Sequence, residues 1–390
     1  MELSYDYAVI GGGVAGYFAI KELAGKGKVV LISDEPDLPY DRPPLSKEYL
    51  RGESKAPFFE SPEFYSRNNI TVFLNESADK IENNTIITSS GLEIKFNKAL
   101  IATGGKPRKL GIPGENKRGV YYLRTLRDAS ILRVSEAKNF VIIGGGFIGV
   151  EAAASLKQKG KEVTLIEALP NILSKLNDKE FSTYLEGYLR SRGIQVLTGE
   201  TAESILGSKQ AEGVKLKGGK EIKAEAVLVA VGIKPSVEVA TSSGIKVSDG
   251  IEVDEHMMTS MKDVYAAGDV AYLYNKYLEE KLRIEHWNNA QYTGALAARN
   301  MLGANESYDF FSTIWSDVFD LHIESAGKLS GWDEKLTLGS YENNKFVFVY
   351  LKEKRAIGYT AVNYERDKLE RLNEAVKARK EISDPNSLSI

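Results

Sequence analysis

The sequence predicts an α/β fold built from two similar units with parallel sheets, followed by a smaller α+β domain. The glycine-rich segments GGGVAG at residues 11–16 and GGGFIG at residues 144–149 predict the two units, since each follows an apolar, strand-like run. Strand-like runs at residues 345–351 and 356–362, followed by a polar helix at 367–379, predict the smaller domain.

Each glycine-rich segment has the setting of a dinucleotide-binding turn. The elements expected around the two segments are strands at 7–10 and 140–143, helices at 17–23 and 150–159, and second strands at 29–32 and 163–166. A strand that turns sharply into a helix directs free N–H groups and the positive helix end at a pyrophosphate, and a Cβ at the glycines would obstruct the turn. We therefore predict two Rossmann-like dinucleotide-binding domains.

An acidic residue follows each turn at the same spacing. Asp34 lies 18 residues after Gly16 (34 − 16), and Glu167 lies 18 residues after Gly149 (167 − 149). A carboxylate there can accept hydrogen bonds from ribose hydroxyls. Two such sites in one chain indicate a resident flavin and an exchanging nicotinamide, and therefore hydride transfer.

Composition sets the outer limits of the function. The chain has 390 residues, of which 43% are hydrophobic and 27% charged, with a net charge of −3. This length suits two or three domains, and the charge gives no general attraction to nucleic acid or anionic lipid. The first predicted strand begins close to Met1 and no long uncharged apolar run is present, so we expect a cytoplasmic protein without a signal peptide or membrane span.

The chain contains 0 cysteines and 3 histidines. The absence of cysteine excludes a thiol relay beside the flavin, disulfides, and thiolate-bound zinc or iron–sulfur clusters. With so few histidines we expect no metal site. Electrons must then leave the flavin directly to the acceptor.

Residues 38–50, LPYDRPPLSKEYL, closely resemble the signature loop of the FAD-dependent, NADH-using ferredoxin reductases. This is the branch of the pyridine nucleotide-disulfide oxidoreductases that includes putidaredoxin reductase and apoptosis-inducing factor. Considered alone, the segment is a proline-stiffened loop that could end in a helix N-cap at Ser46. The resemblance continues in ATGG at 102–105, LRTLRDA at 123–129, VYAAGDVA at 264–271 and IWSDV at 314–318, which departs from the family's FWSDQ at Ile314 and Val318.

The resemblance implies the FAD/NAD(P) fold of glutathione-reductase type, with tightly but non-covalently bound FAD and transient NADH. The residues that it implies for FAD are Gly11, Gly13, Val14, Ala15, Gly16, Asp34, Glu35, Arg42, Lys47, Ala102, Thr103, Gly104, Arg124, Gly268, Asp269, Trp287 and Trp315. Those that it implies for NADH are Gly144, Gly146, Phe147, Ile148, Gly149, Glu151, Glu167 and Gly232. Whether Asp34 or Glu35 holds the FAD ribose stays open.

Lys47 and Glu151 are the residues with an implied catalytic role. The matching family lysine lies beside the isoalloxazine ring and pairs with a glutamate of the NAD domain. A cation there would favour the reduced, anionic flavin. The alternative is a surface ion pair, with Glu151 as an ordinary acidic residue in the first turn of a helix. His286 is expected to pack or to cap a helix, and His256 and His322 are expected to be structural.

Glu167 also bears on the choice of nicotinamide. Its carboxylate would repel a 2′-phosphate, and no arginine follows it at 168–170, so we predict NADH over NADPH. The expected acceptor is a small iron–sulfur carrier, a ferredoxin or a rubredoxin. An NADH oxidase or NADH:quinone reductase, and a redox-sensing interaction protein resembling apoptosis-inducing factor, are the alternatives. The sequence leaves open whether the protein forms a homodimer.

The motifs also predict the domain boundaries. The expected domains are an FAD-binding domain at 1–106 and 230–305, an NAD-binding domain at 107–229 and a C-terminal α+β domain at 306–390.

Overall fold

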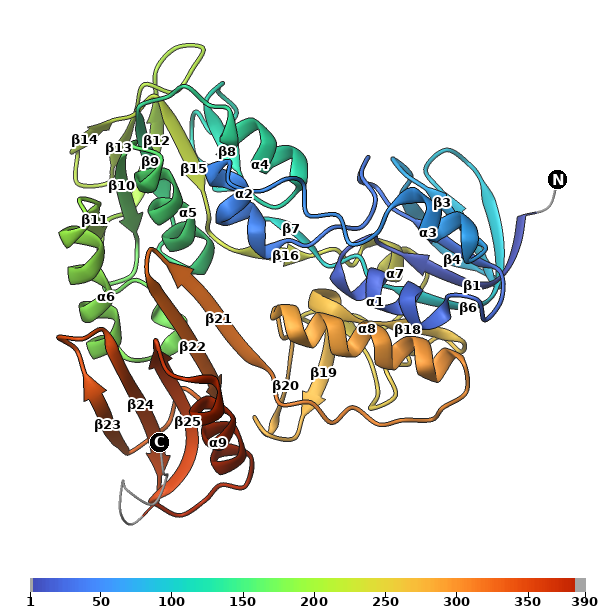
Figure 1. Ribbon diagram of the computed structural model, residues 1–390. Coiled ribbons are helices and arrows are strands. Elements are labelled where there is room, and N and C mark those ends of the chain that lie inside the picture. The colour runs from blue at the N-terminus through green and yellow to red at the C-terminus, as the bar shows by residue number, and fades with distance from the viewer. Residues whose placement is uncertain (1–2, 383–390) are drawn as a thin grey trace. The chain divides into compact units, whose positions relative to one another are not determined.

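The structure, a computed structural model, describes residues 3–382 (Figure 1). The chain forms two compact units, each assembled from separate segments. Unit 1 comprises Met1–Arg42, Ala56–Lys106 and Lys234–Ser312, and unit 2 comprises Pro43–Lys55, Pro107–Ile233 and Thr313–Ile390.

Unit 1 is built on one mixed sheet with the strand order β3-β2-β1-β6-β5-β4, in which β18 also pairs with β6. Its parallel strands are β1 (Leu3–Ile10), β2 (Val29–Ile32), β3 (Ile70–Phe73), β6 (Glu93–Ile101) and β18 (Val264–Ala266); β4 (Ala78–Glu82) and β5 (Thr85–Thr88) are antiparallel. Its helices are α1 (Val14–Leu23), α3 (Pro62–Arg67), α7 (Glu238–Ser242) and α8 (Trp287–Met301), and β17 (Ile251–Glu252), β19 (Ala271–Asn275) and β20 (Glu280–Leu282) form a small sheet.

Helices α1 and α8 pack closely in unit 1. A Cβ at Gly294 of α8 would lie 2.2 Å from the backbone oxygen of Ala15, so only glycine permits this approach. Val9, Leu31 and Leu100 of the sheet are fully buried beneath the two helices. Burial of each such side chain contributes roughly 1.5–3 kcal/mol, which fixes the loop between β1 and α1 on a rigid base.

Unit 2 repeats the strand–turn–helix arrangement on a second parallel sheet, with the order β11-β10-β9-β15-β8. The strands are β8 (Val120–Tyr122), β9 (Asn139–Ile143), β10 (Glu162–Glu167), β11 (Gln195–Thr198) and β15 (Ala226–Val229), with α2 (Glu48–Arg51), α4 (Leu126–Arg133), α5 (Phe147–Gln158) and α6 (Lys179–Ser191). A three-stranded antiparallel sheet of β12 (Ala202–Leu206), β13 (Gly213–Leu216) and β14 (Glu221–Lys223) accompanies it. The short strands β7 (Gly105–Pro107) and β16 (Ile233–Pro235), within which the segments of unit 1 end and begin, pair with each other.

The C-terminal part of unit 2 is an antiparallel sheet with the order β21-β22-β25-β24-β23. Its strands are β21 (Thr313–Val318), β22 (Leu321–Gly327), β23 (Glu334–Ser340), β24 (Lys345–Lys352) and β25 (Arg355–Val362), followed by α9 (Arg366–Lys377). Phe346 and Phe348 of this sheet share one hydrophobic cluster with Phe181 and Leu185 of α6. The C-terminal sheet therefore packs on the second dinucleotide-binding half within one core.

The helices and strands predicted from the sequence appear with small changes at their ends. The helix predicted at 367–379 ends at Lys377, and its apolar residues Leu369, Leu372 and Val376 are buried. The suggested N-cap at Ser46 is wrong, because Lys47 is the N-cap of α2 and the Ser46 hydroxyl turns to Glu151 instead. In the part of the chain that the structure describes, no helix combines the length and apolarity needed to cross a membrane.

Candidate active site

The first glycine-rich turn joins β1 to α1 in a conformation that requires glycine. Gly11 has a φ of 111°, and a Cβ there would lie 2.3 Å from the Ala102 backbone oxygen. At Gly16 a Cβ would lie 1.9 Å from the Gly11 oxygen. Both substitutions would push the helix away from the strand, so these glycines bring the N-terminus of α1 against the sheet.

Gly13, the N-cap of α1, lies beside the Arg42 side chain. The heavy atoms nearest to a Cβ built there belong to the Arg42 guanidinium, at 3.7 and 3.9 Å. Free N–H groups of a helix start and a neighbouring guanidinium together fit a diphosphate. The first turn therefore has the structure that a dinucleotide such as FAD needs.

Arg42 belongs to a charged group that includes two more of the predicted FAD residues. Its Nη2 atom donates to Glu35 Oε1 at 2.6 Å, and the Tyr40 hydroxyl donates to the other oxygen of Glu35. Burial acts to lower the pKa of Arg42, but Tyr40, Glu35 and Asp269 raise it, so the guanidinium stays charged. Asp34 instead is exposed, 3.9 Å from Lys106 Nζ.

Three more of the predicted FAD residues of unit 1 lie at the strand ends beside the same turn. Gly268 has a φ of 76°, its N–H donates to Thr293, and a Cβ there would lie 2.9 Å from Ala15 Cβ. Thr103 Oγ1 donates to the Ser236 backbone oxygen at 2.7 Å, and Gly104 has a φ of 59°. These contacts fix the polypeptide at the carboxyl ends of β6 and β18.

Trp287 and His286 lie at the start of α8. Trp287 Nε1 donates to Asp41 Oδ1 at 2.7 Å, which ties the predicted signature loop to this helix. His286 is the N-cap residue, but its side chain makes no capping bond, and its Nδ1 lies 2.8 Å from Ser312 Oγ.

The second glycine-rich turn, between β9 and α5, has the same backbone. Gly144 has a φ of 115°, and a Cβ there would lie 2.4 Å from the Ala230 oxygen. A Cβ at Gly149 would lie 1.9 Å from the Gly144 oxygen, and one at Gly146 would meet no heavy atom within 4 Å. This turn also fits a dinucleotide. Phe147 and the exposed Ile148 begin α5, and Gly232 has a φ of 93° beyond the end of β15.

Glu167, at the end of β10, forms a hydrogen bond with this second turn. Its Oε2 accepts from the Gly145 N–H at 2.6 Å, and its Oε1 accepts from the Leu169 N–H at 2.8 Å. Two backbone donors therefore hold the carboxylate at the end of the strand, where a ribose would be recognised.

The strand register shows which residues of the two dinucleotide-binding halves are structurally equivalent. The Gly11 N–H bonds to the Ile32 oxygen, and the Gly144 N–H bonds to the Ile166 oxygen. The residue that corresponds to Glu167 is therefore Ser33, although the equal spacing of 18 residues had matched Asp34. The second half has one more residue between turn and strand, so the spacing in sequence does not give structural equivalence.

Lys47 and Glu151 form a buried pair within unit 2. Their closest atoms, Nζ and Oε1, are 3.6 Å apart, and the side chains are 8% and 6% exposed. The alternative of a surface ion pair is therefore wrong. Glu151 also accepts from Ser46 Oγ at 2.5 Å and from Ser316 Oγ at 2.7 Å.

The groups around Glu151 shift its pKa in opposite directions. Burial raises the pKa of Glu151, while Lys47 and the two serine hydroxyls lower it and Asp317 raises it; the net direction is upward. The two serine hydroxyls and the Lys47 ammonium offset part of the cost of burying this carboxyl group.

Asp317 and His322 join this pair, and sequence reasoning missed both. Asp317 Oδ2 lies 3.4 Å from Lys47 Nζ, and Asp317 Oδ1 lies 2.7 Å from His322 Nδ1. The hydrogen bond with His322 lowers the pKa of Asp317 most, and the same bond raises the pKa of His322. The aspartate of the predicted IWSDV segment was the available signal.

Two predicted FAD residues lie in unit 2 with Lys47. Arg124 precedes Thr125, the N-cap of α4, and its N–H donates to Asp128 Oδ2 at 3.2 Å; Trp315 lies on β21 beside Ser316.

Comparison with known proteins agrees with this architecture. Residues 5–294 match the pyridine nucleotide-disulphide oxidoreductase family, and residues 313–387 match the reductase C-terminal family. The 5,5′-dehydrodivanillate O-demethylase ferredoxin reductase subunit of Sphingobium sp. is 34% identical over 375 residues, covering 93% of this chain and 91% of that protein. A rubredoxin-NAD(+) reductase of Ectopseudomonas oleovorans is 32% identical, covering 91% of this chain and 95% of that protein.

Among solved structures, a covalent putidaredoxin reductase–putidaredoxin complex matches with a TM-score of 0.93 and 28% identity, over 99% of this chain and 96% of that chain. The family match covers both glycine-rich turns, and membership implies FAD and a nicotinamide dinucleotide as cofactors. The chain therefore belongs to the pyridine nucleotide-disulphide oxidoreductase family and, having 0 cysteines, is a member without the redox disulfide for which that family is named.

Proposed function

We propose that this oxidoreductase transfers hydride from NADH to FAD and passes the electrons singly to a small iron–sulfur protein, a ferredoxin or a rubredoxin. The observation that carries the proposal is the pair of dinucleotide turns in a chain without cysteine. Bound FAD supplies the conversion between two-electron and one-electron transfer. The relatives named for ferredoxin and rubredoxin reduction support this choice of acceptor.

In this proposal, the first turn with Arg42 retains FAD, and the second turn with Glu167 exchanges NADH. Lys47 stabilises the negative charge that arrives with the hydride, and Glu151 holds the Lys47 ammonium in one place. The burial of both side chains supports a stronger electrostatic effect than a surface pair would give.

The preference for NADH is part of the proposal. Both oxygens of Glu167 are held by backbone N–H groups, so the carboxylate cannot easily turn away from a 2′-phosphate. The following residues 168–170 supply no arginine to offset the repulsion.

Anaerobic stopped-flow spectroscopy tests the acceptor. The FAD-loaded protein is reduced with NADH and then mixed in parallel with ferredoxin, rubredoxin, a quinone or air-saturated buffer. Reoxidation by a ferredoxin or rubredoxin at least about tenfold faster than by quinone or O2 supports the proposal. The reverse order identifies an NADH oxidase or quinone reductase, and slow reoxidation by every acceptor identifies a redox-sensing protein.

The role of Lys47 is tested by Lys47→Met. We expect flavin reduction by NADH to slow by about 10- to 100-fold with FAD retained, because a buried cation contributes about 1.4–2.8 kcal/mol to a developing charge. Lys215→Met is the matched control, since it removes a cation from an exposed pair, 2.9 Å from Glu203. Equal reduction rates for both variants would remove Lys47 from the mechanism.

The domain boundaries at 106, 230 and 305 stay a proposal, as do a cytoplasmic location and a homodimer. Analytical ultracentrifugation of the FAD-loaded protein distinguishes a homodimer from a monomer.

A further inference from the structure

The Asp317 carboxylate is shared between a cation and a histidine. One oxygen lies 3.4 Å from Lys47 Nζ and the other lies 2.7 Å from His322 Nδ1. Asp317 on β21 and His322 on β22 are direct partners in the antiparallel register, so the contact is built into the hairpin. The His322 imidazole, a side chain type that gains or loses a proton more readily than other cations, is thus one carboxylate away from the proposed catalytic lysine.

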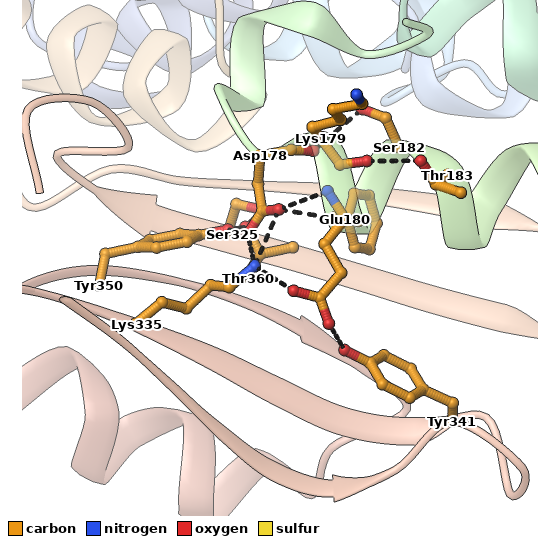
Figure 2. Close-up of polar contacts among 11 residues, drawn as sticks. Asp178, Lys179, Glu180, Ser182, Thr183, Ser325, Lys335, Tyr341, Tyr350 and Thr360 are labelled. Carbon is orange, nitrogen blue, oxygen red and sulfur yellow. Dashed lines mark hydrogen bonds and ion pairs between the residues drawn. The ribbon is translucent and has the colours of Figure 1, made fainter. Parts of the chain in front are cut away.

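The antiparallel sheet that contains this hairpin contacts both ends of α6. At the start of the helix, Lys335 of β23 lies 2.9 Å from Asp178 and 2.7 Å from Glu180, and Tyr341 and Tyr350 donate to the same two carboxylates (Figure 2).

At the other end of α6, the turn between β21 and β22 is fixed. Arg192 lies 2.5 Å from Asp320 in this turn, the Tyr188 hydroxyl donates to the same carboxylate, and the Arg192 guanidinium lies 5.6 Å from the centre of the Phe319 ring. Phe319 has a φ of 57°, which is unusual for an aromatic residue. These contacts keep Asp317 beside Lys47.

The charged groups that act on His322 are few and can be named. Asp317 raises the pKa of His322 through its hydrogen bond, burial lowers it, Glu324 on the same strand raises it and Lys47 lowers it; the net direction is upward. Glu324 accepts from the Tyr359 hydroxyl of β25 at 2.6 Å. Tyr359 also contacts Asn373 of α9, which carries no charge.

We propose that His322 is a positioning residue for Lys47: its imidazole and the Lys47 ammonium compete for the Asp317 carboxylate, so protonation of His322 weakens the hold of Asp317 on Lys47. Protonation of the imidazole adds a positive charge to its hydrogen bond with the carboxylate, so the imidazolium attracts Asp317 more strongly than the neutral ring does. The kinetic consequence rests on the proposed function of Lys47, whereas the coupling between the three side chains does not.

The sign of the effect follows from the charges. When His322 is protonated, Asp317 neutralises the Lys47 ammonium less. The ammonium then stabilises the negative charge that arrives with the hydride more strongly. Reduction by NADH is therefore fastest below the pKa of His322 and slows as the pH rises through it. We expect a change of about threefold, in keeping with a partly exposed charge pair.

The coupling is tested by NMR titration of the histidine side chains in the FAD-loaded full chain. With 3 histidines in the protein, the His322 signal is identified by its loss in His322→Gln. We expect Lys47→Met to raise the pKa of His322, because a cation is removed, and Asp317→Asn to lower it. An unchanged pKa in both variants would overturn the proposal.

The kinetic consequence is tested by the pH profile of flavin reduction. We expect His322→Gln to hold the slow rate at all pH values and His322→Lys to hold the fast rate, while the control His256→Gln keeps the wild-type profile. Superimposed profiles for wild type and His322→Gln contradict the positioning role. If NADH does not reduce the flavin at all, the proposed function fails and the NMR titration alone decides the coupling.

Discussion

Gly11 and Gly144 adopt φ values of 111° and 115°, and a Cβ on either would lie 2.3 or 2.4 Å from a carbonyl oxygen of the neighbouring strand end. The side chains around the two turns differ. Arg42 borders Gly13, whereas no heavy atom lies within 4 Å of a Cβ at Gly146. The backbone for dinucleotide binding is thus duplicated, and the charge around it is not.

A second difference lies two residues after the last glycine of each turn. The first half has Phe18, which packs edge-on against Trp287, and the second half has the buried Glu151. The first helix therefore uses this position for packing, and the second uses it to hold Lys47. The comparison teaches that binding depends on the shared backbone, whereas the proposed chemistry depends on the side chains that only one copy carries.

The largest effects are expected from breaking one turn at a time. Gly11→Ala should give protein with little FAD, because a positive φ costs about 1–3 kcal/mol and the Cβ also meets a fixed carbonyl. Gly144→Ala should keep FAD and raise the KM for NADH at least about tenfold. The flavin-to-protein absorbance ratio and NADH kinetics measure the two outcomes.

Gly160→Ala is the control for this pair, since Gly160 has a φ of 77° and no heavy atom within 4 Å of its Cβ position. Gly160→Ala measures the effect of placing a Cβ on a residue with positive φ where no steric collision occurs. Loss of FAD in Gly144→Ala but not in Gly11→Ala would reverse the assignment of the two turns.

Arg42→Gln tests the difference in charge between the turns by removing it. We expect the Kd for FAD to rise about 10- to 100-fold, since hydrogen bonds to charged groups contribute about 1.5–3 kcal/mol. The KM for NADH should stay the same. Fluorescence titration of the apoprotein with FAD measures the change, and Lys106→Gln, which removes an exposed cation near Asp34, is the control.

Glu167→Ser should lower the preference for NADH, measured as kcat/KM for NADH divided by kcat/KM for NADPH, by about tenfold, because the carboxylate that repels a 2′-phosphate is removed. Glu162→Gln, at the exposed start of the same strand, should leave the ratio unchanged. A wild-type enzyme that prefers NADPH would contradict the role given to Glu167.

The smallest expected effect concerns stability against pH. Burial raises the pKa of Glu151 above its unfolded value, so the folded state binds this proton more tightly than the unfolded state does. As the pH rises from the ordinary pKa through the raised one, the wild-type protein therefore loses stability relative to Glu151→Gln. We expect the difference in Tm between the two proteins to change by about 2 °C across this range. Phe18→Leu, at the equivalent position of the first half, should show a Tm difference that does not depend on pH.

Much of the fold was predictable because its signals are local. The glycines, the buried strands beside them and the acidic Glu167 lie within about three turns of helix and one strand of each other in the sequence, and the structure places them together. The pairing of Lys47 with Glu151 came from the family resemblance, and the structure places the two side chains in contact.

The sequence by itself determined the two turns, because glycine is required wherever a side chain would collide with a fixed carbonyl, and it determined that no thiol takes part, because the chain has 0 cysteines. Only the tertiary structure decided that Ser33, and not Asp34, corresponds to Glu167, since strand register and not residue spacing sets equivalence. It also decided that Asp317, with His322 on its other oxygen, reaches Lys47, because the contact with Lys47 joins residues about 270 positions apart, for which no local pattern exists.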